Sequence, residues 1–159
     1  MHLYLEIFLR ILLATALGGV VGLERERSHK SAGLRTNALV AMGAALLTVI
    51  SLSFGGAGSD PSRIISNIIV GIGFIGGGAI IREGHKVSGV TTAATLWVVA
   101  AIGIAVGMGF YREALFSAAV VYFILTMLWL IEKKANQKIL YPSLREKEIA
   151  EENHGEEEL

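Results

Sequence analysis

The stretch from Gly89 to Gly109, GVTTAATLWVVAAIGIAVGMG, contains no charged side chain. A helix of this length covers about 30 Å, the thickness of the hydrocarbon core of a membrane. Four further apolar runs of similar length occupy residues 3–23, 34–54, 62–81 and 113–131. The sequence therefore predicts an all-α, polytopic membrane protein in which residues 1–131 form a bundle of five transmembrane helices.

The composition agrees with this class and excludes others. Of the 159 residues 53% are hydrophobic and 18% are charged, against about 25% charged in soluble domains. Thirteen of the 28 charged residues lie in 132–159, where we expect a cytoplasmic helical extension ended by Pro142 and then an acidic disordered tail. Balanced charge gives no support for a nucleic-acid partner, and the absence of cysteine excludes thiolate chemistry. A solvated tail is favoured over an interaction tail.

The basic residues predict the direction of the chain across the membrane. The loops after the first and third runs, together with the tail, hold eleven of them, and the opposite side holds two, Arg63 and Arg112. The eleven are Arg25, Arg27, Lys30, Arg35, Arg82, Lys86, Lys133, Lys134, Lys138, Arg145 and Lys147. Because basic loops stay in the cytoplasm, we expect the N-terminus outside and the C-terminus in the cytoplasm.

Glycine is dense in the third run, where Gly71-Ile-Gly-Phe-Ile-Gly76 matches the dinucleotide-binding pattern. That pattern works only between a strand and a helix, so its place inside an apolar run excludes this function. Glycines four residues apart instead favour close helix packing, while a broken helix that exposes carbonyls to an ion is the alternative. The predicted packing residues are Gly18, Gly22, Gly71, Gly73, Gly76, Gly77, Gly103 and Gly107.

Polar residues suggest one cluster on the outer side. Arg10 lies inside the first run, which costs roughly 2.5–3.5 kcal/mol at mid-helix, so it needs a partner among Glu6, Asp60 and Glu113. A snorkelling Arg10 paired with Glu6 is the simpler alternative. Asp60 and Pro61 also suit a helix start. The indole N–H of Trp97 is expected to find a partner in the bundle. The hypothetical cluster contains Arg10, Asp60, Arg63, Thr91, Thr92 and Trp97.

A second polar group follows the first run. Glu24 to Lys30 is read as a charged loop, and Arg82 to Lys86 as a short turn in which Gly84 ends a helix. Interleaved Glu residues weaken attraction to anionic lipid, so an ordered salt-bridge network or a partner surface is favoured over simple anchoring. The residues of this cytoplasmic hairpin are Glu24, Arg25, Glu26, Arg35, Thr36 and Asn37.

Taken in order, these motifs resemble the MgtC/SapB family of bacterial inner-membrane proteins over about residues 8–130. The matching stretches are Gly22–Glu26, Ala32–Asn37, Asp60–Arg63, Gly71–Gly78, Gly89–Ala94 with Trp97, and Ala101–Gly103 with Gly107 and Gly109. The resemblance implies a cell inner-membrane location, a link to magnesium limitation and acid tolerance, and regulation of membrane partners such as the proton-driven ATP synthase. Roles that some members tie to Asn at position 91, Cys at position 98 or a soluble C-terminal domain do not transfer.

Two functions are weighed from these observations. The first is a non-enzymatic protein that supports magnesium or ion homeostasis through partners, and the second is a transporter or channel for Mg2+ or another cation. Mg2+ prefers carboxylate ligands, yet no Asp or Glu lies near the middle of a predicted span, which favours the first. An intramembrane enzyme lacks a nucleophile–base pair. We expect no cofactor, although binding of Mg2+ is left open. We also expect the chain to form a homo-oligomer.

The predicted orientation can be tested by cysteine labelling, because the chain has no cysteine of its own. In intact cells, a membrane-impermeant maleimide should label Ala57→Cys, which lies in a predicted outer loop. Ser28→Cys and Ala150→Cys should react only after the membrane is permeabilised. Labelling of Ser28→Cys from outside would reverse the orientation.

Overall fold

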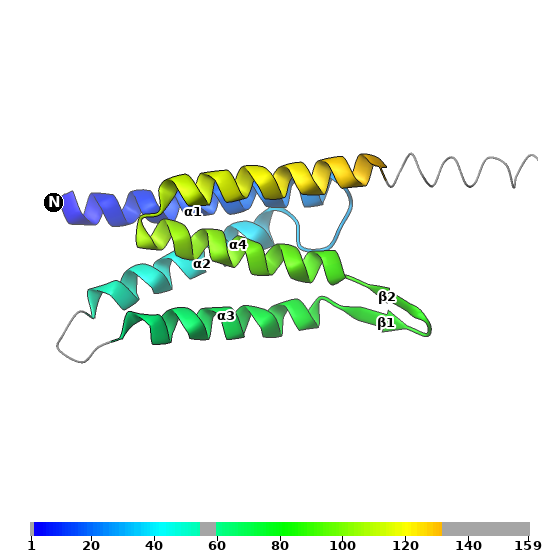
Figure 1. The fold of residues 1–159 in the computed structure, drawn as a ribbon, viewed down its shortest axis with the longest axis horizontal. Helices are drawn as coiled ribbons and strands as arrows, with labels where there is room; N and C mark the ends of the chain where they lie inside the picture. The colour runs from blue at the N-terminus through cyan, green and yellow to red at the C-terminus, as the bar shows by residue number, and fades with distance from the viewer. Residues whose placement is uncertain (1, 55–59, 132–159) are drawn as a thin grey trace, which may run out of the picture. The chain divides into compact units, whose positions relative to one another are not determined.

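A computed structural model describes residues 2–54 and 60–131 of the chain, so the predicted extension and tail lie outside the described residues. Contacts divide the chain into two units, Met1–Phe123 and Ile124–Leu159, and the packing considered below lies within the first. The element order is α1 His2–Arg27, α2 Leu34–Ser53, α3 Pro61–Gly78, β1 Ile81–Glu83, β2 Lys86–Ser88 and α4 Val90–Met108 (Figure 1). A fifth helix, Tyr111–Ile131, follows after a turn in which Gly109 has φ 88°.

Four helices in the described part of the chain are long and apolar enough to cross a membrane, namely α1, α2, α4 and the fifth helix. The all-α class and the five helices are thus confirmed. The 18-residue helix α3 is not among these four, and its first half carries polar residues. Membrane crossing by α3 and the orientation of the bundle stay predictions.

The ends of two predicted elements are wrong. Helix α1 continues to Arg27, so Glu24–Arg27 are helical rather than a loop, because Glu and Arg are favourable helix formers. Helix α3 ends at Gly78, and the expected turn is instead an antiparallel hairpin in which Arg82 pairs with Val87. Gly84, at φ 60°, lies between the two strands and does not end a helix. Figure 1 shows this hairpin extending from the ends of α3 and α4.

Helix α2 packs against both α1 and α4, which also contact each other, and it meets glycines of both helices closely. A β-carbon on Gly18 would lie 2.6 Å from the β-carbon of Ala41, and one on Gly107 would lie 2.7 Å from that of Thr48. Gly22 and Gly103 meet the backbone of α2 in the same way. These four of the predicted glycines therefore lie at close helix contacts, where any side chain would separate the helices.

The glycines of α3 behave differently. Only Gly76 reaches ordinary contact, 3.5 Å from Ala93, while β-carbons on Gly71, Gly73 and Gly77 would meet nothing within 4 Å. Within one chain these three residues therefore make no close helix contact, and their packing role stays a prediction. Helix α3 is also continuous across the glycine run, so the broken-helix alternative is not observed. Ile72 instead joins α3 to a buried apolar cluster with Ala44, Leu96, Ala100 and Ile104.

Candidate functional site

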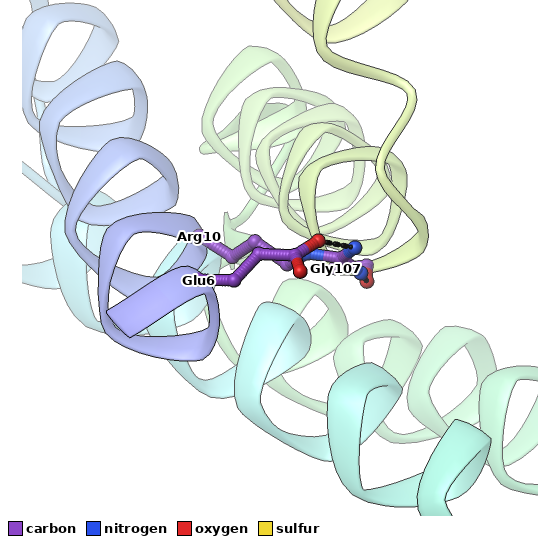
Figure 2. A network of polar contacts seen from close by, with 3 residues as sticks. All are labelled: Glu6, Arg10 and Gly107. Carbon is purple, nitrogen blue, oxygen red and sulfur yellow. Dashed lines mark hydrogen bonds and ion pairs between the residues drawn. The ribbon is translucent and has the colours of Figure 1, made fainter. Parts of the chain in front are cut away.

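Arg10 is held at the end of the bundle where α4 finishes (Figure 2). Its Nη1 donates to the carbonyl of Gly107 at 2.7 Å, and its Nη2 forms an ion pair with Glu6 on the preceding turn. The guanidinium also lies 5.9 Å from the ring centroid of Tyr111. Carbonyls in the last turn of a helix lack an intrahelical donor and carry partial negative charge, so Arg10 caps α4 from outside.

Asp60 is the N-cap residue of α3 and lies apart from Arg10. Its Oδ1 accepts a hydrogen bond from the backbone N–H of Ser62 at 2.9 Å, and Pro61 occupies the first helical turn, as predicted. Hydrogen bonds from Ser62 and the nearby charge of Arg63 hold the pKa of Asp60 below its ordinary value. Both Asp60 and Arg63 are exposed, and neither contacts Arg10 among the described residues.

The threonines of the predicted outer cluster lie at the other end of α4. The hydroxyl of Thr92 accepts from Arg25 Nη2 at 3.0 Å. Because Thr92 and Gly107 are fifteen residues apart on one helix, they are separated by about 22 Å. Thr91 is exposed, and Trp97 is 49% exposed rather than turned into the bundle. The hypothesis of one cluster joining Arg10 to Thr91, Thr92 and Trp97 is therefore wrong.

The predicted cytoplasmic hairpin is ordered by hydrogen bonds. Glu26 Oε2 accepts from the backbone N–H of Leu34 at 2.9 Å and so caps α2, whose own N-cap residue is a glycine. Asn37, fully buried, donates to the carbonyls of Ala32 and Gly33. No ion pair occurs in this hairpin as described, which corrects the expected salt-bridge network.

Burial divides the hairpin residues into two groups. Glu24, Arg25 and Asn37 are buried, at 6%, 5% and 0% exposed, whereas Glu26, Arg35 and Thr36 are exposed. Glu24 Oε1 accepts from the hydroxyl of Ser28 at 2.8 Å. Three buried atoms, Glu24 Oε2, Arg25 Nε and Asn37 Oδ1, have no hydrogen-bond partner. Buried polar atoms normally have partners, so this end of the bundle is the candidate site.

Ser31 was not among the predicted site residues, yet its hydroxyl lies 3.2 Å from that of Thr92. The predicted orientation indicates this contact, because it puts the start of the fourth span on the same side of the membrane as the hairpin. Ser31 and Thr92 therefore join the site with Arg25. No group of three or more His, Asp or Glu residues capable of holding a metal ion occurs in 2–54 and 60–131.

Comparison with known proteins identifies the family. The model of the MgtC family matches residues 11–134, and the chain belongs to this family. It is 39% identical over 127 residues to "Putative magnesium transporter YhiD" of Escherichia coli, covering 76% of this chain and 59% of the relative. It is 46% identical to an uncharacterized protein of Synechocystis (slr0014), covering 73% and 49%, and 45% identical to "Protein MgtC" of Salmonella typhimurium, covering 71% and 48%.

The chain thus spans about half of the length of these relatives. No solved structure matches it. The helical segments together with the family establish a multi-pass membrane protein with bacterial relatives.

The separate environments of Arg10 and Asp60 predict that substitutions at the two positions are independent. Arg10→Leu should lower the free energy of unfolding by about 1.5–3 kcal/mol, because the Gly107 carbonyl loses a charged donor. Asp60→Asn should have little effect, since Asn is also a good N-cap. Chemical unfolding in detergent micelles should show that the double variant is additive within about 0.5 kcal/mol. A coupling energy above this value would indicate contact between the two side chains.

Proposed function

We propose that this chain is a bacterial inner-membrane protein that supports magnesium and ion homeostasis, or adaptation to acid, by regulating membrane partners. Membership of the MgtC family supports the biological setting. Regulation rather than transport is favoured because the described residues inside the bundle form no continuous row of ion ligands from one end to the other. The proton-driven ATP synthase is the partner that the family resemblance suggests.

The observation that carries this proposal is the close packing of α2 against α1 and α4, without ion ligands along the contact among the described residues. The buried ionisable residues, Glu24 and Arg25, lie at one end of these helices. Between the ends, the hydroxyls of Thr48 and Thr95 donate to carbonyls of their own helices, at 2.7 and 2.8 Å. Since Mg2+ needs several oxygen ligands and keeps bound water, this interior does not suit it.

The alternative function is transport of Mg2+ or another cation. The name of the Escherichia coli relative favours this alternative. Transport would then use a surface outside the α1–α2–α4 contact, and α3 is the available helix. Its exposed side includes Asn67, for which no hydrogen bond is found in the described residues.

We also propose that a second copy of the chain covers α3. An apolar groove of about 580 Å³ lies between α2 and α3 and is lined by Gly43, Leu47, Asn67 and Gly71 among others. An exposed Asn side chain is unfavourable against lipid and finds a partner in a neighbouring helix. Gly73 and Gly77 have the spacing used by the packed glycine pairs but have no neighbour in their own chain. A homo-oligomer would supply one.

The two functions make opposite predictions for a purified system. Liposomes that contain only this protein should show no uptake of Mg2+ or protons above that of protein-free liposomes. The gene, expressed in a bacterium that lacks its own family member, should nevertheless restore growth at low Mg2+. Protein-dependent Mg2+ flux that saturates with concentration would instead establish the transporter.

Assembly through α3 predicts different effects for two kinds of glycine. Gly73→Leu and Gly77→Leu should leave thermal stability of the monomer in detergent unchanged but reduce the oligomer mass measured by light scattering. Gly103→Leu serves as the matched contrast and should lower thermal stability itself, because its side chain would overlap the backbone of Ala41. Wild-type oligomer mass in both α3 variants would leave this face to lipid.

A further inference from the structure

Arg25 is a buried cation shared by three segments of the chain. It projects from the last turns of α1 and is 5% exposed. Its Nη2 donates to Thr92 Oγ1 in the first turn of α4, and that oxygen lies 3.2 Å from the hydroxyl of Ser31 in the loop after α1. The guanidinium and two hydroxyls therefore meet at one place.

In the described part of the chain this cation forms no salt bridge, and the charge of the neighbouring buried Glu24 acts on it only at longer range. The ion pair found there joins Arg10 to Glu6, at the far end of α1, so no carboxylate lies within 4 Å of Arg25. The neighbouring Glu24 is engaged by Ser28 through its Oε1 instead. Arg25 Nε is also buried without an acceptor. A buried guanidinium without a direct salt-bridge partner is unfavourable, so an anion that bonds to Arg25 itself would stabilise this position.

The start of α4 also favours a bound anion. Its N-cap residue, Gly89, provides no side-chain cap, and its first turn contains no acidic residue. Free N–H groups and the helix dipole give this end partial positive charge. With Arg25 bonded to the third residue of the helix, two positive groups lie together, and both are stabilised by a bound anion.

We propose that this site binds a phosphate group. A phosphate offers several acceptor oxygens, which suit the forked guanidinium of Arg25, the hydroxyls of Ser31 and Thr92, and backbone N–H groups of α4 together. Ser31 and Thr91 are exposed, so the site opens to the surface, where exposed Lys30 and Arg35 attract anions. The group can belong to a lipid headgroup, since the apolar part of α1 ends beside it, or to free phosphate.

The proposal is independent of whether the protein regulates partners or conducts an ion, because it concerns binding alone. The test uses the full chain purified in detergent and delipidated. Thermal unfolding is followed in sodium phosphate and in sodium chloride of equal ionic strength. In parallel, native mass spectrometry measures retention of dioleoyl phosphatidylglycerol against dioleoylglycerol, which lacks phosphate.

The wild-type chain should gain thermal stability from phosphate, or retain phosphatidylglycerol in preference to dioleoylglycerol. The first result identifies free phosphate and the second a lipid headgroup. Arg25→Gln should weaken this binding about tenfold or more, since a charged hydrogen-bond donor is lost. Arg25→Lys should restore part of it. Arg27→Gln, an exposed residue on the same helical turn, is the matched control and should bind as wild type.

Thr92→Val keeps the side-chain shape while removing the hydroxyl, and it decides the outcome if Arg25→Gln does not fold. It should also weaken binding of whichever phosphate compound the wild type prefers. Binding by neither assay in the wild type would overturn the proposal. Equal binding by the wild type and by the folded Arg25 or Thr92 variant would do the same.

Discussion

The close approach of α1 and α4 to α2 is the constraint on which the described bundle depends. Glycines at positions 18 and 22 of α1, and 103 and 107 of α4, leave no room for a β-carbon against α2. Lipid tails are as apolar as the side chains, so helices in a membrane gain little from hydrophobic burial. They gain from dispersion contacts at short range, which only small residues permit.

The same helix faces explain where the polar groups lie. Arg25 is seven residues beyond Gly18, two turns along the same face of α1, so the face that packs tightly also delivers a guanidinium to its end. Arg10 occupies the opposite end and bonds to Gly107, a residue of the packed α4 face. The glycine contacts thus fix the separation at which these two side chains reach α4. Polar bonding at the two ends then sets the register between α1 and α4.

The sequence allowed the helices to be predicted but not the faces they present. Charged residues, Gly89 and the Asp60–Pro61 pair mark helix limits through local chemistry, and α2 and α4 accordingly lie within a residue of expectation. The rotation of a helix about its axis decides which of its glycines face a neighbour. The second half of α3 contains only apolar residues and glycine, so its sequence does not predict this rotation. Depth alone likewise did not show that Trp97 points outward. The contact of Thr92 with Arg25 could have been predicted, since the predicted orientation puts both residues on the cytoplasmic side of the membrane.

Helix α3 differs from the others in a way that separates stability from interaction. The α1–α2–α4 contact is complete without its glycines, and α3 joins through Ile72 and Gly76 on one side only. Its exposed side therefore carries glycines and Asn67, which make no contact that would stabilise the fold of a single chain. The proposed second copy of the chain would give Asn67 a partner. The close-packed helices α1, α2 and α4 thus hold the proposed phosphate site at one end, while α3 offers a separate face through which the proposed assembly would not disturb that site.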